Sequence, residues 1–304
     1  MRVRVAIGLV IAILLFVCAF WLIKSGLYAW TLFAMLPMVV GAAAVWIVKP
    51  DSQSEAAGLG STAAFVSTLV FLLAGLEGIV CVAMALPITV PFGALGGWLT
   101  YRLCTARREA HGLALMVLLP LGTLSFDRNA KPEIYRVETQ VTVAAPPEMV
   151  WENVVTFPAL AEPTEWVFKT GLAYPQRARI EGSGVGAVRY CEFSTGPFVE
   201  PIEVWDEPRL LRFSVTENPA PLREWSPYGE LDLPHLHGYM ISKQGEFRLE
   251  RLENGQTLLR GTTWYQHGLW PAEYWRWWSD AIIHRIHLRV LNHVKELSEE
   301  KTSN

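Results

Sequence analysis

Charged side chains are distributed very unequally along this chain of 304 residues, and that distribution limits what the chain can fold into. Residues 1–126 carry 11 charged side chains, whereas residues 127–304 carry 44. The first stretch consists mostly of apolar residues and glycine, and the second has the mixed composition of a soluble domain. We therefore expect residues 1–126 to form a transmembrane helical region, residues 127–133 a short linker and residues 134–300 one globular domain.

Two apolar runs at the start of the chain predict a pair of transmembrane helices. A helix needs about 20 apolar residues to cross a hydrocarbon layer of about 30 Å. Residues 5–23 form an uncharged run of 19 residues, and no small-residue cleavage site follows it. We therefore expect a retained span rather than a cleaved signal peptide. Residues 27–48 predict a second span, which the tight reversal at Ser25-Gly26 would pair with the first.

The rest of the apolar region predicts two or three further spans. A polar connector covers residues 51–60, and the apolar stretch 61–101 is long enough for two helices, with a break at residues 75–78. Glu77 lies in this break. It is either an acid inside the membrane, which would mark a functional site, or a residue of a hydrated turn, which we favour. Residues 111–126 form a shorter last run, so the total is four or five spans.

Basic residues favour a cytoplasmic N-terminus. With five spans, all the Lys and Arg residues of this region except Lys24 fall on one side, and cytoplasmic loops are enriched in these residues. Five spans would place the soluble domain outside the cell, and four would keep it inside. We expect an integral protein of the plasma membrane with an external domain, although cysteine usage does not decide the compartment, because Cys191 is alone in the soluble part.

Charge and motifs exclude several function classes. Residues 127–304 have a net charge of −6, so nucleic acid is not an expected partner. The sequence has no phosphate-binding glycine loop, dinucleotide fingerprint or nucleophile elbow, and we expect neither a cofactor nor covalent catalysis. The histidine pairs 235/237 and 284/287 lack further ligands at metal-site spacing, so no metal is expected.

Periodicity predicts an α+β domain of antiparallel strands and one long C-terminal helix. Residues 134–143 alternate between apolar and polar side chains, as a half-buried strand does, and Pro147 is suited to the first turn of a helix. Later strands flank short turns, of which Asn254-Gly255 is the strongest hairpin signal. Further strands are expected at 174–181, 187–193, 199–205, 210–216, 245–252 and 256–266, a long irregular connection at 216–239 and a helix at 271–300.

Three segments resemble the START-like (SRPBCC, polyketide cyclase/dehydrase) superfamily. Residues 141–151 are similar to the opening strand and helix of these domains, residues 204–215 to their central hairpin, and residues 245–264 to their last hairpin. The resemblance implies a curved antiparallel sheet that grips the C-terminal helix, with a deep cavity between them suited to a hydrophobic small molecule or lipid. It does not imply one activity, because the superfamily includes binding proteins and enzymes.

Candidate ligand-binding residues combine aromatic bodies with polar groups, as many binding sites do. They come from a strand with two possible inward faces, from the proline-rich connection and from the aromatic segment 264–278. The set comprises Arg189, Tyr190, Glu192, Trp225, Tyr239, Trp264, Tyr265, His267 and Trp278. Adjacent helix positions point about 100° apart, so not all tryptophans of 275–278 can face one core. We expect Trp275 and Trp277 to be exposed and to contact the membrane.

Three functions fit this sequence. The first is a membrane-anchored domain that binds a hydrophobic molecule near the bilayer. The second is a cyclase-like or hydrolytic enzyme in which His267, Glu192 or Arg189 moves protons or stabilises charge, which requires these groups to converge inside a cavity. The third is an interaction module whose cavity has collapsed. We favour binding over catalysis.

Overall fold

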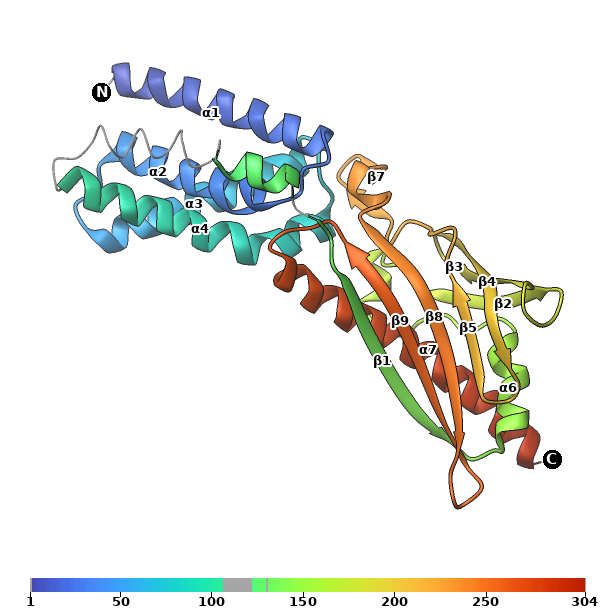
Figure 1. Cartoon of the computed structure of the whole chain (residues 1–304). Coiled ribbons are helices and arrows are strands. Elements are labelled where there is room, and N and C mark those ends of the chain that lie inside the picture. The colour runs from blue at the N-terminus through green and yellow to red at the C-terminus, as the bar shows by residue number, and fades with distance from the viewer. Residues whose placement is uncertain (1, 106–121, 130, 304) are drawn as a thin grey trace. The chain divides into compact units, whose positions relative to one another are not determined.

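The computed structural model describes residues 2–105, 122–129 and 131–303, which form two compact units (Figure 1). The first unit contains residues 1–131 together with Glu224–His235 and Gly268–Pro271. The second contains Pro132–Arg223, Leu236–His267 and Ala272–Asn304. Two segments of the expected soluble domain are therefore part of the first unit.

The first unit is built on apolar helices. They are α1 (Arg2–Lys24), the π-helical turn η1 (Thr31–Met35) that leads into α2 (Leu36–Val48), α3 (Gln53–Leu73) and α4 (Ile79–Thr105). Within the described part of the chain, four stretches are long and apolar enough to cross a membrane: Ala6–Lys24, Thr31–Val48, Gln53–Leu73 and Ile79–Thr105. The predicted fifth span, 111–126, lies largely outside the described residues. The structure describes residues 122–129, which overlap the end of this span and are helical.

The expected connector at 51–60 is mostly wrong, because α3 already begins at Gln53. Ser52 caps this helix by accepting a hydrogen bond from the Glu55 backbone N–H (3.2 Å), and the Glu55 carboxylate accepts one from the Asp51 N–H (3.1 Å). The two contacts together stabilise a helix start among polar residues. The predicted break at 75–78 is confirmed, since α3 ends at Leu73 and α4 begins at Ile79.

Glycine allows the central helices of the first unit to approach closely. A Cβ added to Gly41 of α2 would lie 2.1 Å from the Gly93 carbonyl oxygen of α4, and one added to Gly60 of α3 would lie 2.3 Å from the same atom. A Cβ on Gly96 would lie 2.0 Å from the Met38 carbonyl oxygen. Small residues at such crossings allow the backbone contact that drives helix association in lipid.

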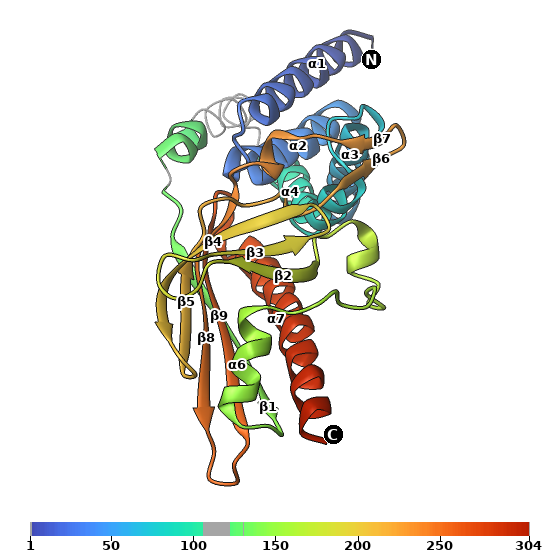
Figure 2. The same cartoon turned by 90° about the vertical axis from the view of Figure 1, so that its right-hand side faces the viewer.

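The second unit is a seven-stranded antiparallel sheet with two helices on the same side (Figure 2). The strand order is β1-β9-β8-β5-β4-β3-β2. The elements are β1 (Ile134–Val143), α6 (Pro147–Val155), β2 (Pro175–Glu181), β3 (Val188–Phe193), β4 (Gly196–Asp206), β5 (Leu210–Ser214), β8 (Met240–Arg251), β9 (Thr257–His267) and α7 (Ala272–Ser303).

Sequence alternation positions the core of this unit. Strand β1 buries alternate residues, as its period predicts, and pairs with β9 along its whole length. Leu259 of β9 and Leu291 of α7 are fully buried in the main hydrophobic cluster, to which α6 contributes Val150 and Val154. The predicted strands and helix ends agree with the structure to within a few residues, except that β8 begins five residues earlier, at Met240.

The long connection 216–239 is not irregular throughout. It contains a small hairpin of β6 (Glu224–Ser226) and β7 (Gly229–Leu231), followed by the 3-10 turn η3 (Pro234–Leu236). Residues 224–235, half of this connection, belong to the first unit. The Tyr228 hydroxyl donates a hydrogen bond to the Leu73 carbonyl oxygen at the end of α3 (2.6 Å).

Candidate functional site

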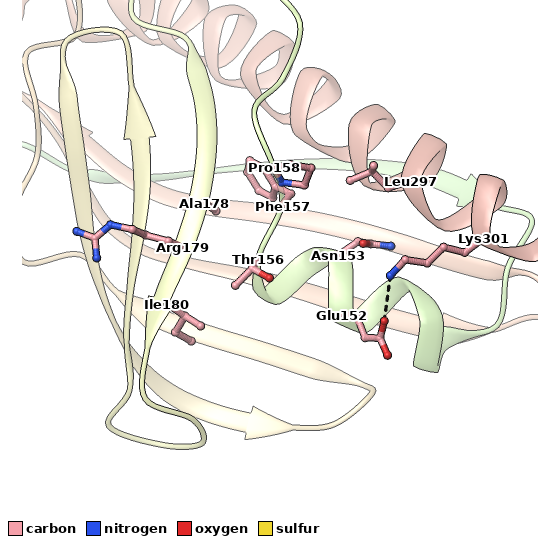
Figure 3. Close-up of a pocket in the computed structure, with 10 residues that line it drawn as sticks. All are labelled: Glu152, Asn153, Thr156, Phe157, Pro158, Ala178, Arg179, Ile180, Leu297 and Lys301. Atoms are coloured by element: carbon pink, nitrogen blue, oxygen red, sulfur yellow. Dashed lines mark hydrogen bonds and ion pairs between the residues drawn. The ribbon is translucent and has the colours of Figure 1, made fainter.

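A groove of about 670 Å³ opens in the second unit where α6, β2 and the C-terminal part of α7 meet (Figure 3). Its size lies in the range of sites that hold small molecules. Apolar and polar side chains share the lining, which comprises Glu152, Asn153, Thr156, Phe157, Pro158, Ala178, Arg179, Ile180, Leu297 and Lys301.

The apolar part of the groove is fixed by a short bridge between two elements. Phe157 follows the end of α6, and its backbone exchanges hydrogen bonds of 3.2 and 3.1 Å with Ala178 of β2. This bridge holds Phe157 next to Ala178, Ile180 lies further along β2, and Leu297 approaches from α7. An apolar portion of a ligand would find its contacts here.

Charged groups surround the groove, and each has a partner. Lys301 Nζ donates to Glu152 Oε2 at 3.1 Å, which links α7 to α6. Arg179 pairs with Glu181 (2.5 Å) and with Glu192 (3.3 Å), and its side chain points away from the two helices in Figure 3. The groove therefore offers an apolar wall and a rim of neutralised charge.

Arg189 forms a buried ion pair below this groove. The residue is 1% exposed, and its guanidinium donates to the Glu200 carboxylate on the neighbouring strand and from Nε to the Val155 carbonyl oxygen (3.1 Å). Burial raises the pKa of Glu200, although the Arg189 cation opposes this shift. Three phenylalanine rings lie 5.5 to 5.6 Å from the guanidinium carbon, namely Phe157, Phe213 and Phe247. Phe157 thus contacts both the groove and the ion pair.

A second polar group lies between the sheet and α7. His287 is within hydrogen-bond distance of Thr263 Oγ1 through Nε2 (2.8 Å) and of Thr139 Oγ1 through Nδ1 (3.1 Å). His284 Nδ1 reaches the same Thr139 hydroxyl at 2.7 Å. Desolvation, together with the neighbouring His284, lowers the pKa of His287 to about 4. The two imidazoles thus bridge the helix and strands β1 and β9.

Aromatic side chains fill the end of the sheet near the start of α7. Tyr265 is fully buried and donates a hydrogen bond to Asp280 of α7 (2.5 Å). Burial, with the Asp280 carboxylate, raises the pKa of this phenol. The Tyr135 ring stacks on His267 at 5.1 Å.

Comparisons with known proteins find likeness in solved structures only. No protein-family model and no curated protein matches the chain. Norcoclaurine synthase from Thalictrum flavum is 13% identical over 58% of this chain and 98% of its own, with a TM-score of 0.36. An aromatase/cyclase from Streptomyces sp. R1128 is 20% identical over 56% and 96%, with a TM-score of 0.35. The Aha1 dimer from Colwellia psychrerythraea is 16% identical over 54% and 96%, with a TM-score of 0.31.

The strand order and the long helix against the inner face of the curved sheet decide the architecture. The second unit therefore has the helix-grip arrangement that the sequence resemblance to START-like domains implies, and we call it the START-like unit. The expected fold is confirmed. The START-like unit does not include residues 224–235 or 268–271, which belong to the first unit.

The predicted site residues of β3 separate between the two faces of the sheet. Arg189 and Cys191 are buried and point inward, which resolves the two alternatives left by the sequence. Tyr190 and Glu192 lie on the outer face, where Glu192 accepts from Arg177 Nε at 2.6 Å. The expectation that Tyr190 and Glu192 face a cavity is wrong, because strand alternation opposes them to Arg189.

The predicted residues of the aromatic segment divide in the same way. Tyr265 and His267 are buried on the inner face of β9. Trp264 lies on the outer face, in register with Arg136 of β1, whose guanidinium is 5.7 Å from the indole ring. Trp264 therefore does not face the space between sheet and helix.

The remaining predicted residues do not converge on one site. Trp225 is 48% exposed and belongs to the first unit, apart from the START-like unit to which it was assigned. Tyr239 is half-buried before β8, and Trp278 is half-buried on α7, where its ring contacts Trp277. None of the nine predicted residues lines the groove.

The tryptophans at the start of α7 meet the expectation only in part. Trp277 is 63% exposed, as predicted. Trp275 is 5% exposed, so the expectation that it is available to a membrane is wrong. Two helix positions separate these residues, which turns their side chains to nearly opposite directions.

The structure also assembles a polar cluster that the sequence did not reveal. Glu77 lies in the predicted turn, but it is 8% exposed rather than hydrated, because residues 224–235 pack over this turn. The Tyr28 hydroxyl donates to Glu77 Oε1 (2.8 Å), and Cys81 Sγ is 3.0 Å from His235 Nε2. Glu224 Oε1 accepts from the Cys81 N–H (2.7 Å).

Spacing alone could show only part of this cluster. Glu77 and Cys81 stand four positions apart around the start of α4. Cys81 and His235 are 154 positions apart, so no local pattern relates them. All five residues of the cluster lie in the first unit.

Proposed function

We propose that this protein is a membrane-anchored START-like domain that binds a hydrophobic small molecule or lipid in the groove between α6, α7 and β2. The observation that carries the proposal is the groove itself, which joins an apolar wall of Phe157, Ile180 and Leu297 to a charged rim. Its volume of about 670 Å³ suits a small molecule or one acyl chain with part of its head group.

Apolar helices in the same chain give this binding a location. A ligand dissolved in the bilayer meets a tethered site at high effective concentration, so modest affinity suffices. The described residues contain four candidate spans, which support membrane insertion, and an external placement also requires the predicted fifth span at 111–126. We propose the plasma membrane as the location, with the START-like unit outside the cell.

Contacts inside the first unit support the external placement. Tyr28 follows α1 and Glu77 follows α3, and their hydrogen bond puts both connections at one end of the helices. The Trp270 N–H donates to the Tyr28 carbonyl oxygen (3.0 Å). If α1 spans the membrane, this end is opposite the N-terminus. Polar chain does not remain in hydrocarbon, so the chain around Trp270 would lie on that side, which is outside the cell if the N-terminus is cytoplasmic.

Binding rather than catalysis is our proposal because the candidate proton-transfer groups do not converge. Glu192 lies on the outer face of β3 and pairs with Arg177, whereas Arg189 is held inside by Glu200. Among these candidates only Arg189 and His267 are buried. An enzyme would need them grouped around one substrate position.

Photolabelling of the full chain in nanodiscs tests the proposal. The probes are a fatty acid and a fatty alcohol of equal length, each with a diazirine at the chain end, and labelled peptides are identified by mass spectrometry. We expect label in the peptides that contain Phe157 and Ile180. Stronger labelling by the acid would show that the rim selects an anionic head group, and equal labelling would show recognition of the chain alone.

A matched pair of variants controls this experiment. Thr156→Trp places an indole in the groove and should reduce the labelling of these peptides at least about fivefold. Ala159→Trp adds the same side chain at an exposed position outside the groove lining and should leave labelling unchanged. Label confined to the apolar helices, with none in the groove peptides, would refute the proposed site.

A further inference from the structure

Three different metal-ligating side chains meet at one end of the apolar helices. A carboxylate (Glu77), a thiol (Cys81) and an imidazole (His235) offer ligand atoms that all lie within 4.8 Å of one another. In a tetrahedral zinc site, bond lengths of about 2.3 Å to sulfur and about 2.0 Å to nitrogen place these two atoms about 3.6 Å apart. Cys81 Sγ and His235 Nε2 are 3.0 Å apart, so a small outward movement would admit an ion.

Buried carboxylate oxygens provide independent evidence for a cation. Glu77 Oε2 and Glu224 Oε2 are buried and have no hydrogen-bond partner among the residues that the structure describes. Glu77 Oε2 lies 3.8 Å from His235 Nδ1, which forms an ion pair with it only when the imidazole is protonated, and neither carboxylate pairs with a lysine or arginine of that same part of the chain. A buried carboxylate without such a partner is costly, and a bound cation would offset that cost.

Tight packing holds the second carboxylate beside the ligands. A Cβ added to Gly78 would lie 2.4 Å from the Glu224 carboxyl carbon, so only glycine fits at this point of the turn. Glu224 is fully buried. Its negative charge next to Cys81 and Glu77 would favour any cation bound there.

The mixture of donor atoms selects the class of ion. Calcium and magnesium require oxygen ligands, whereas thiolate and imidazole suit zinc and related borderline-soft ions. The Tyr28 hydroxyl, which donates to Glu77 Oε1, would orient the carboxylate, as outer partners do for metal ligands. Three protein ligands leave the fourth tetrahedral position open.

We propose that Glu77, Cys81 and His235 form a binding site for one zinc ion in the first unit. The ion joins the turn before α4 to the segment 224–235, which lies far along the chain. This site is independent of the groove and of its proposed ligand.

Zinc binding by the full chain, purified in detergent with a tag that lacks histidine, tests this site. Equilibrium dialysis with zinc and elemental analysis should find about one zinc per chain in the wild type. Cys81→Ser and His235→Gln should each weaken zinc binding at least about tenfold. The controls are Cys104→Ser, in the last turn of the same helix, and His237→Gln, at an exposed position beside the site, and both should bind zinc as the wild type does.

Cobalt substitution gives a measurement that needs no variant. Cobalt bound at this site should show absorption from a cobalt–thiolate bond together with the visible bands of tetrahedral cobalt. Wild-type protein without that absorption would overturn the proposal. Equal zinc affinity in the wild type and both ligand variants would overturn it as well, and so would loss of zinc from the two controls.

Discussion

Arg189 is the largest fully buried side chain among the described residues, and its contribution to stability depends on its ion-pair partner Glu200. The Glu200 carboxylate neutralises it inside a ring of phenylalanines. Removing one member of a buried pair leaves an isolated charge and costs about 3–5 kcal/mol, whereas replacing both with apolar residues is often nearly neutral. The Arg189–Glu200 pair would then contribute to the choice of a single packed structure rather than to the free energy of unfolding.

A double-mutant cycle tests this argument in the full chain. Arg189→Met should lower the free energy of unfolding by about 3–5 kcal/mol, and Arg189→Met combined with Glu200→Leu should lower it by less. Arg177→Met is the control, because Arg177 of β2 pairs with Glu192 on the exposed face of β3, and its loss should cost under about 1 kcal/mol. Equal losses for the two arginine variants would contradict this account. Denaturant unfolding followed by tryptophan fluorescence gives the values.

His287 should make the stability of the START-like unit depend on pH. Its pKa is lowered from 6.5 to about 4 in the folded state, so the unfolded chain binds the proton more readily. The neutral imidazole therefore contributes stability that is complete above about pH 6.5 and lost as the pH falls towards 4. Because water reaches part of this side chain, we expect the loss to be about 2 kcal/mol.

Unfolding measured at several pH values checks this expectation. His287→Gln keeps a polar side chain between α7 and the two threonines but does not titrate in this range. Its stability should fall less steeply than that of the wild type between pH 6.5 and 4. Parallel curves in that window would show that His287 does not carry the effect.

At the scale of elements, glycine positions determine whether the apolar helices can pack. Gly96→Ala would place a methyl group 2.0 Å from the Met38 carbonyl oxygen, which forces α4 away from α2. Gly58→Ala meets nothing within 4 Å and also removes a flexible residue from α3. We expect Gly96→Ala to lower the melting temperature in detergent by several degrees and Gly58→Ala to leave it unchanged or raise it slightly. Equal melting temperatures would contradict the close packing of α2 and α4.

Alternation, turn residues and capping residues predicted most of the helices and strands. Where the prediction of an element was wrong, the cause lies in the local sequence of that element. Strand β1 agrees with its alternation residue for residue, because one of its faces is buried. The start of α3 was misplaced because the polar residues 51–60 suggested a connector, although Ser52 and Glu55 have the spacing of a capping pair. The hairpin β6–β7 was missed because its strands are only three residues long.

At the scale of the whole molecule, the sequence predicted the fold far better than the site. The helix-grip order follows from alternation and turn residues, which act over short distances. The groove joins residues of α6, β2 and α7, and the cluster at Glu77 joins positions 154 residues apart. Alternation on β3 allowed two inward faces, and only packing around Arg189 chose between them.

Membrane topology is a prediction for the whole chain. A single cysteine introduced at Glu253, exposed in the β8–β9 turn, should react with an impermeant maleimide in intact cells if the START-like unit is outside. A cysteine introduced at Ser54, exposed at the start of α3, should react only after lysis. Native cysteines are replaced by serine or alanine where this is tolerated. The reverse pattern of labelling would place the START-like unit in the cytoplasm.

Residues 224–235 complete the first unit, yet the ribosome makes them long after α4. Until residues 224–235 are synthesised, they cannot pack on the turn that contains Glu77, and the first unit is incomplete. Assembly of the membrane part therefore depends on synthesis of most of the START-like unit. A chain cut at residue 131 would separate the apolar helices from residues 224–235, so the first unit would have to assemble from parts of both fragments.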